Sequence, residues 1–389
     1  MPINYLSIKE QIPNFVNLHH KALTKRHSLI DTAIELLTAA AQNPEIVAQL
    51  IEREQQNNQY LQCAGPCRES MSNVFSTNQN MGPSWQMLGV DGSQISPDPH
   101  SPLTFGLVNI GIFDMPGDTG SPPHQQTVSR LITKETETDE LYIPTEEEVH
   151  FIRDLEERKI LVSLSTETPD PLIALTDGPL GLFREPQNDS LWFTEFETLM
   201  QDYQKLPSSK RIIAGYVDRP RSNMVVQMLN LWLKSTLPSA SQPVSLAGLR
   251  DTDFFAKLIP SGQRSAVFTL HSRSGRFFQD ELALHFFYLN VSPDDEPALV
   301  RVEIPAWVAK NNDLVNQLHV QLLTQCKILG NKPYPYVLHR AHEVAIVHQD
   351  EKLNLESMMT KVWLEKGLPI PNFSFKQALK NLVGSRRRI

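Results

Sequence analysis

The sequence predicts an α/β fold in which a mixed sheet is flanked by helices. Short apolar runs of the strand type alternate with helical segments through the centre of the chain, and the last part is helical. Crossover connections dominate the middle, so one large domain is expected over residues 85–366. A helical arm and polar linker over 1–84 would precede it, and a basic tail over 367–389 would follow it.

The N-terminal part is expected to contain an amphipathic helix over 28–52. Ser28 and Asp31 have the spacing of a capping box. Apolar residues follow at helical spacing, namely Ile30, Ala33, Ile34 and Leu37. The stretch from about 54 to 84 is rich in Asn, Gln and Ser, which favours a linker or a loosely packed arm.

Strands and helices alternate from Trp85 onward. Strands are expected over 87–91, 103–113, 172–175, 211–217, 265–271, 281–291 and 298–304. Helices are expected over 145–161, 190–206, 223–234, 306–328, 336–349 and 353–366. Thr145 and Glu148 predict a capping box at the start of the first of these helices. Residues 115–140 are rich in Gly, Pro, Thr and Glu, which predicts an exposed insertion.

Composition restricts the class of protein. With 40% hydrophobic residues among 389, the chain can bury a core without disulfide or metal staples. Cys63, Cys67 and Cys326 are too few for a disulfide scaffold, and the first two lack the second ligand pair of a structural zinc site. No segment resembles a signal peptide or approaches the ~20 apolar residues that span a membrane, so a cytoplasmic location is expected.

The charge distribution limits how the protein could bind DNA. The net charge is −8, so any DNA-binding surface must be local, with the acidic residues kept elsewhere. The most basic stretch is the C-terminal tail, which contains Lys376, Lys380, Arg386, Arg387 and Arg388 and no acidic residue. This tail is either a DNA contact or an ordinary solvated terminus.

Two aspartates share a local context that favours a functional site. Asp91 and Asp177 each end an apolar run, and each is followed by glycine. An Asp at the end of a buried strand lies where a sheet opens into a crevice in which ligands collect. Asp-Gly is also an ordinary turn signal, but two such pairs that both end apolar strands favour the functional interpretation.

A third carboxylate is expected on the helix over 145–161. At about 100° per residue, its apolar face is defined by Val149, Ile152 and Ile160. Glu156 falls in the middle of that face, and a buried carboxylate is costly unless it is paired, protonated or bound to a cation. Glu156 is therefore the predicted ligand. Pairing with Arg153 would also explain its position, and Glu157 on the flank is the alternative ligand.

His342 is the candidate on the late helix. It shares a face with small or apolar neighbours, Leu338, Ala341 and Ala345, so it is expected to point inward. A lone inward histidine is more often a hydrogen-bonded core residue than a ligand.

If the three carboxylates and His342 converge on one crevice, they suit Mg²⁺ or Mn²⁺ better than zinc, because hard oxygen ligands dominate. Two such ions ~4 Å apart can activate a water and stabilise the leaving oxygen of a phosphoryl displacement, which is nuclease chemistry. The sequence has neither the phosphate-binding loop of nucleotide hydrolases nor the nucleophile elbow of acyl hydrolases.

The order of these motifs resembles the NurA family of DNA nucleases, which act with the HerA ATPase in DNA end processing. The likeness covers about residues 85–350 and rests on five motifs: Val90-Asp-Gly-Ser93, Arg153-Asp-Leu-Glu156, Leu175-Thr-Asp-Gly-Pro-Leu180, Ile213 to Ser222, and Tyr334 to Glu343. The resemblance implies a ribonuclease-H-like fold, Mn²⁺-dependent 5′–3′ exonuclease and single-strand endonuclease activity, and a ring-shaped homodimer docked on hexameric HerA.

The resemblance also implies roles for individual residues. The metal-binding carboxylates would be Asp91, Glu156 and Asp177, and His342 would be a late metal-site or catalytic residue. Tyr216 would contact or position DNA, while Arg219 and Arg221 would contact phosphate.

Two departures from the family pattern bear on these roles. The family commonly has a Lys where this chain has Asp218. An extra loop around 165–171 loosens the spacing from Glu156 to Asp177, which keeps Glu157 open as the ligand.

Two other interpretations follow from the same residues. One is a catalytically inactive ribonuclease-H-like scaffold that binds DNA ends or a partner, although a dead site has no reason to keep costly carboxylates. The other is a different nuclease of this fold, such as a junction resolvase, which would share the metals but not the dimer ring.

Overall fold

The structure is a computed structural model. The residues it describes are 3–77, 85–98, 101, 103–117, 120–133, 142–182, 192–236 and 245–368. The chain divides into two compact units: unit 1 comprises Met1–Met81 and Gly215–Tyr334, and unit 2 comprises Gly82–Ala214 and Pro335–Ile389. The basic residues of the expected C-terminal tail lie outside the described residues.

Unit 2 is built on a mixed sheet. Its strands lie in the order β5-β4-β3-β6-β7, with β3 at Gln86–Ile95, β4 at Gly106–Met115, β5 at His124–Ile132, β6 at Leu172–Asp177 and β7 at Arg211–Val217. β3, β4 and β5 form an antiparallel meander, and β6 pairs parallel to β3. A meander continued by a parallel strand beside its first strand is the ribonuclease-H-like arrangement, so the expected fold class is confirmed.

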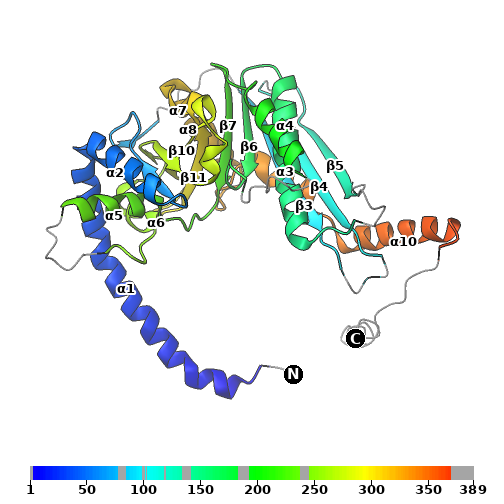
Figure 1. The fold of residues 1–389 in the computed structure, drawn as a ribbon, viewed down its shortest axis with the longest axis horizontal. Helices are drawn as coiled ribbons and strands as arrows, with labels where there is room; N and C mark the ends of the chain where they lie inside the picture. Colours follow the sequence, from blue (N-terminus) through cyan, green and yellow to red (C-terminus); the bar gives the residue numbers. More distant parts are fainter. Residues whose placement is uncertain are drawn as a thin grey trace. The chain divides into compact units, whose positions relative to one another are not determined.

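Helices cover both faces of this sheet. They are α3 (Glu146–Glu167), α4 (Phe193–Tyr203) and α9 (Tyr336–Ala345), and α10 (Gln349–Glu365) follows α9 in the chain. A Cβ atom on Gly92 would meet Glu157 of α3, whereas one on Gly89 would overlap the backbone of Val337 in α9. Successive side chains of a strand point to opposite faces, so α3 and α9 cover opposite faces of β3. Figure 1 shows α3 and α4 together on one of them.

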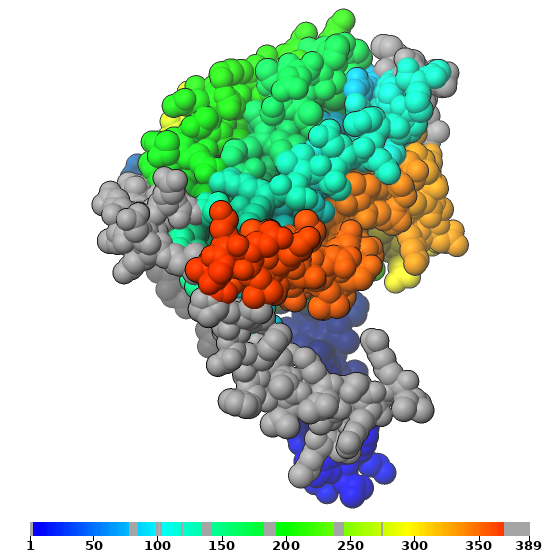
Figure 2. All heavy atoms as spheres, turned by 90° about the vertical axis from the view of Figure 1, so that its right-hand side faces the viewer, coloured from blue at the N-terminus to red at the C-terminus, as the bar shows by residue number. Residues whose placement is uncertain are grey.

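The first and last helices of unit 2 differ in how they are fixed to the rest of the unit. At the start of α3, Thr145 Oγ1 accepts a hydrogen bond from the Glu148 backbone N–H, and the Glu148 carboxylate accepts one from the Thr145 N–H. The predicted capping box is therefore confirmed. By contrast, α10 has no buried residue, and Figure 2 shows it in red across the surface of unit 2.

Unit 1 has a core of its own. Its strands run β1-β9-β10-β11 and then the end of β7, with β1 at Cys63–Gly65, β9 at Phe268–His271, β10 at Leu284–Asn290 and β11 at Leu299–Pro305. Two short strands, β2 (Val74–Phe75) and β8 (Arg264–Ser265), pair with each other, and β8 also pairs with β10. The helices are α1 (Tyr5–Ala41), α2 (Pro44–Asn57), α5 (Met224–Thr236), α6 (Asp251–Leu258), α7 (Ala306–Ala309) and α8 (Asn312–Ile328), with 3-10 turns at Ser274–Arg276 and Asp280–Leu282.

An apolar stripe runs along α1, interrupted by His19 and Arg26, and only its second half is buried. At about 100° per residue, the stripe contains the buried residues Ile30, Ala33, Leu37 and Ala40. Towards the N-terminus the same stripe continues through Tyr5, Ile8, Ile12 and Phe15, whose exposed fractions are 44–74%. Figure 1 shows this half, in dark blue, projecting from the rest of unit 1. Among the described residues, no helix is long and apolar enough to span a membrane.

The structure differs from the sequence prediction in several segments. The helix expected over 306–328 is divided into α7 and α8. The helix expected over 28–52 is also two helices. The first of them, α1, starts at Tyr5, so Ser28 and Asp31 lie inside it and the expected capping box is wrong. Pro44 then starts α2 in the first turn, where the missing N–H of proline is tolerated. The expected linker contributes strand β1, in which Cys63 and Ala64 are buried. The expected loop over 115–140 contains β5, a mostly exposed edge strand whose polar sequence carries no strand alternation.

Candidate active site

Asp91 and His342 form the contact at the centre of the candidate site. Asp91 lies in β3 and is buried, and its Oδ2 is 2.7 Å from Nδ1 of His342 in α9. The neighbours of His342 are buried as predicted, but its own inward position is wrong, because 58% of its side chain is exposed. An exposed imidazole held by a buried carboxylate can exchange protons with a substrate, which a core histidine cannot do.

Two glycines let α9 approach the sheet closely enough for this contact. A Cβ atom on Gly89 would overlap the carbonyl of Val337. One on Gly111, which pairs with Asp91 across the β3–β4 ladder, would overlap the carbonyl of Ala341. Glycine inside a strand often marks a close approach of another backbone, so these glycines are a signal that the sequence analysis missed.

The C-terminal end of α9 is fixed to the same two strands. Ser93 Oγ of β3 and Asn109 Nδ2 of β4 both donate to the carbonyl of Ala345, the latter at 2.8 Å. Asn109 is oriented in turn by Ser129 of β5, whose hydroxyl donates to Asn109 Oδ1 at 2.7 Å. These bonds satisfy a carbonyl that the helix itself leaves unpaired, and they set the position of α9 along β3.

Asp177 lies beside Asp91 on the neighbouring strand. The parallel register pairs Val90 with Thr176, so Asp91 and Asp177 take the next position on strands that lie ~4.8 Å apart. β6 ends at Asp177, and Gly178 follows with φ of 89°, which a side chain would strain. β3 instead continues past Asp91 because β4 pairs with it there. Only Asp177 is therefore the strand-end residue that the sequence predicted for both.

Glu157 is the carboxylate of α3 that packs against β3 at Gly92, on the opposite face of the strand from the side chain of Asp91. It is buried, and a Cβ atom on Gly92 would lie 2.6 Å from its Oε1. Its oxygens are 3.3 Å from Arg153 Nε and 2.6 Å from Arg158 Nη1. Burial raises the pKa of Glu157 to about 8; the two arginines oppose this rise, while Asp154 and Asp91 add to it.

Glu156, the predicted ligand, faces a different group of charges. Its carboxylate accepts from Lys159 Nζ at 2.8 Å and pairs with Arg130 of β5. Both cations also bind Glu195 of α4, with distances of 2.8 Å from Lys159 Nζ and 3.1 Å from Arg130 Nη1. Of the two glutamates, Glu157, the alternative that the sequence left open, is the one that packs against β3, whereas Glu156 faces Arg130 and Lys159.

Helical phase alone does not separate Glu156 from Glu157, because α3 is buried on more than one side. It packs against β3 and β4 on the sheet side and against α4 on another. Residues 155–158 are all buried in consequence, while Ile160, which the sequence analysis used to define the apolar face, is only partly buried. A single apolar stripe cannot identify the site face of a helix with several contact surfaces.

The donor set suits a divalent cation in chemical type. Carboxylate oxygens with one imidazole are ligands that Mg²⁺ and Mn²⁺ accept. Within the part of the chain that the structure describes, no group of three or more His, Cys, Asp or Glu side chains is arranged to hold a metal ion. To bind one, these side chains would have to turn toward one another.

A family comparison covers the segment that carries this site. The model of the NurA domain matches residues 86–347, which include Asp91, Glu157, Asp177 and His342. The chain belongs to the NurA family. Among curated proteins, none matches it.

Solved structures similar to this NurA protein are distant in sequence. The NurA nuclease from Sulfolobus solfataricus is 10% identical, with 87% of this chain and 98% of that chain covered and a TM-score of 0.49. The catalytic domain of human Endonuclease V is 11% identical, with 84% and 100% covered and a TM-score of 0.31. Endonuclease V from Bacillus subtilis is 11% identical, with 72% and 83% covered and a TM-score of 0.28. With TM-scores below 0.5, these likenesses add no argument to the family assignment.

The NurA residues expected to bind DNA lie in unit 1. Tyr216 is fully buried, with its hydroxyl 3.8 Å from Cys326 Sγ and its ring edge-to-face with Tyr334 at 5.4 Å. Of its two expected roles, only positioning is compatible with this burial. Arg219 and Arg221 are exposed and line a cavity of unit 1.

Proposed function

We propose that this NurA protein is a divalent-metal-dependent DNA nuclease. The observation that carries the proposal is the contact between buried Asp91 and exposed His342, with Asp177 in register on the adjacent strand and Glu157 buried across Gly92. Carboxylates of this kind and number, supported by one imidazole, are what phosphodiester hydrolysis by a metal mechanism requires. Membership of the NurA family supports the same function.

The metal ligands in this proposal are Asp91, Asp177 and Glu157, with His342 close by, and the cations are two ions of Mn²⁺ or Mg²⁺. Such ions supply an activated water and stabilisation of the leaving oxygen. Glu157 takes the place that Glu156 had in the sequence prediction, because Glu157 is the one of the two that packs against β3.

His342 is suited to hold or transfer a proton at the site. Asp91 Oδ2 faces its Nδ1, which orients the ring and leaves Nε2 for a water or a phosphate oxygen.

The test is a cleavage assay on labelled single-stranded and double-stranded DNA with Mn²⁺, Mg²⁺ or EDTA. We expect hydrolysis with a metal, none in EDTA, and none with Asp91→Ala. Asp202→Ala, which removes an exposed carboxylate of α4 that pairs with Lys205, is the matched control and should cleave normally. A protein that binds DNA but hydrolyses it under none of these conditions would be the inactive scaffold instead.

The finer activity and the ATPase partner rest on the family alone. We propose 5′–3′ exonuclease and single-strand endonuclease activity in DNA end processing, and docking on a hexameric ATPase of the HerA type. End-labelled substrates decide the polarity, because a 5′–3′ enzyme releases a 5′ label first. Failure of a HerA-type hexamer to retain the protein in a pull-down would contradict the complex.

We also propose that the protein forms a homodimer, and the exposed stripe of α1 supplies a surface for it. Large exposed apolar patches mark interaction sites, and this one continues a stripe that is already buried against the core of unit 1. A second copy presents the same stripe, so two such helices can cover each other. Light scattering should show more than the monomer mass of 44.1 kDa, and Ile12→Asp with Phe15→Asp should restore the monomer.

A further inference from the structure

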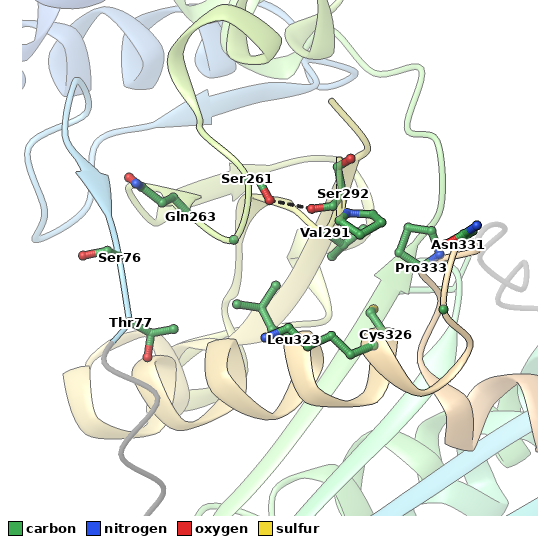
Figure 3. Close-up of a pocket in the computed structure, with 14 residues that line it drawn as sticks. Ser76, Thr77, Ser261, Gln263, Val291, Ser292, Leu323, Cys326, Asn331 and Pro333 are labelled. Atoms are coloured by element: carbon green, nitrogen blue, oxygen red, sulfur yellow. Dashed lines mark hydrogen bonds between the residues drawn. The ribbon is translucent and has the colours of Figure 1, made fainter. Parts of the chain in front are cut away.

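Two cavities of unit 1 adjoin each other. Their volumes are about 540 Å³ and about 850 Å³, the size range of small-molecule sites. They share the lining residues Val291, Ser292, Pro293, Asn331 and Pro333. Figure 3 shows the smaller cavity, with Ser76 and Thr77 on one side, Asn331 and Pro333 on the other, and the hydrogen-bonded pair of Ser261 and Ser292 between them. We call the two cavities together the unit 1 track.

Basic side chains line this track. Lys327 lines the smaller cavity, and the larger is lined by Arg219, Arg221, Arg250 and Lys332. In the described part of the chain, the only ion pair among these cations is between Arg219 Nε and Asp218 Oδ2, at 3.9 Å. Asp218, Asp294 and Glu296 also line the larger cavity, so its positive excess is small. The polar lining suits phosphate and sugar oxygens, which take hydrogen bonds from arginine, lysine, hydroxyl and amide groups.

Arg219 combines an unusual backbone conformation with an exposed side chain. Its φ is 45°, a left-handed value that costs energy for a residue with a side chain, and its side chain is 94% exposed. Such conformations persist where the surrounding structure enforces them, and they gather at ligand-binding sites.

An aromatic ring completes the lining. Tyr334 lines the larger cavity and is held edge-to-face by the buried ring of Tyr216. Sites for single-stranded nucleic acid combine basic groups that follow the backbone with aromatic rings on which unpaired bases stack. A duplex does not offer such bases.

We propose that the unit 1 track binds single-stranded nucleic acid. In this site Tyr334 stacks a base, and Arg219, Arg221, Arg250, Lys332 and Lys327 contact successive phosphates. The proposal rests on the proposed function, for which the track is a substrate-binding surface. It gives Tyr216 its role as the support of Tyr334, and it adds Arg250, Lys332, Lys327 and Tyr334 to the DNA-binding residues expected from the sequence.

Fluorescence anisotropy of the full chain in EDTA, with a labelled oligothymidylate and a duplex of the same length, tests this proposal. Arg250→Glu with Lys332→Glu should weaken single-strand binding about tenfold or more. The same variant should lower the slope of log K against log salt by about 0.7 for each phosphate that the protein no longer neutralises. Lys205→Glu reverses an exposed charge that lines neither cavity and should bind as the wild type.

Tyr334→Leu should weaken single-strand binding about tenfold, and Tyr334→Phe, which keeps the ring, should restore it. Wild-type binding by the double charge-reversal variant, or equal binding of the duplex by the wild-type protein, would overturn the proposal. Normal cleavage by Asp91→Ala would defeat the proposed nuclease site without touching the track.

Discussion

Asp91 and His342 are 251 positions apart in the chain, yet Asp91 Oδ2 and His342 Nδ1 are 2.7 Å apart. The contact joins the middle of β3 to the second half of α9. It depends on a close approach of helix to sheet that only glycine permits at positions 89 and 111. Substitutions of the residues around this contact therefore test the candidate site.

Asp177→Ala should abolish metal-dependent cleavage while the protein stays folded. Asp177 ends β6 and is only partly buried, so its removal costs little packing but takes away a carboxylate next to Asp91. Cleavage rates at matched metal and salt, together with the melting temperature, provide the check. Retained activity in a folded variant would remove Asp177 from the site.

Glu157→Gln should eliminate cleavage, and Glu156→Gln should retain most of it. The first change keeps the side-chain volume but removes the buried carboxyl group of the proposed ligand. The second breaks ion pairs with Arg130 and Lys159, which both keep Glu195 as a partner, so its cost should be about 1–3 kcal/mol of stability. Paired assays of the two variants decide the matter. If Glu156→Gln is the inactive one, Glu156 is the ligand and the helical phase inferred from the sequence is right.

Gly111→Ala should lower cleavage sharply and destabilise unit 2 by about 1–3 kcal/mol, because the added methyl overlaps α9 and pushes His342 away from Asp91. Gly275→Ala is the matched control, since a Cβ there meets only ordinary contacts at 3.7 Å and 3.8 Å. Cleavage rates and denaturant unfolding of both variants measure the effect. Equal activity of the two would show that the close approach of α9 does not set the catalytic contact.

Arg221→Ala should weaken DNA binding for all sequences alike, because phosphate contacts carry no base information. It should also flatten the salt dependence of log K by about 0.7–0.9 for each phosphate left without its cation. The overall charge of −8 repels DNA, so affinity must come from local basic groups. Truncation after Gly384 tests the tail arginines in the same titration. Unchanged affinity and slope in both variants would place the DNA path elsewhere.

Stability should fall as the pH drops from about 6.5 to about 4, in part because of His319. Burial lowers the pKa of His319 to about 4, with the charge of Arg264 adding to the effect. The unfolded chain therefore takes up a proton in this pH window that the folded chain refuses, which costs up to about 3 kcal/mol. His319→Gln can still donate to the Gly262 carbonyl, so it should match the wild type at pH 7 and exceed it near pH 5 in thermal unfolding. Parallel pH profiles of the two proteins would contradict this assignment.

Local signals predicted the elements that begin or end with a specific side chain. The capping box of Thr145 and Glu148 placed the start of α3, and the apolar run before Asp177 placed β6. β5 was missed because it is an edge strand whose polar side chains show no alternation. The contact of Asp91 with His342 could be inferred only from the family resemblance, since local patterns carry no information on which distant segments pack together.

The choice between Glu156 and Glu157 shows where periodicity stops being informative. Both carboxylates are buried, because α3 contacts the sheet and α4 at once. Their difference lies in their partners: Arg130 comes from a strand that the sequence did not predict, and Gly92 accepts Glu157 because it has no side chain. The periodicity of α3 alone therefore cannot show which partner Glu156 or Glu157 contacts.

The exposed half of α1 makes the protein longer than its folded core requires. Residues 5–24 would extend roughly 30 Å at 1.5 Å per residue. Pro13 removes one backbone hydrogen bond within this length, which gives the arm a defined place to bend. A protease that cut near Thr24 would release this exposed segment and leave Ile30, Ala33 and Leu37 in the core. Its removal should therefore take away the proposed dimer surface without unfolding unit 1.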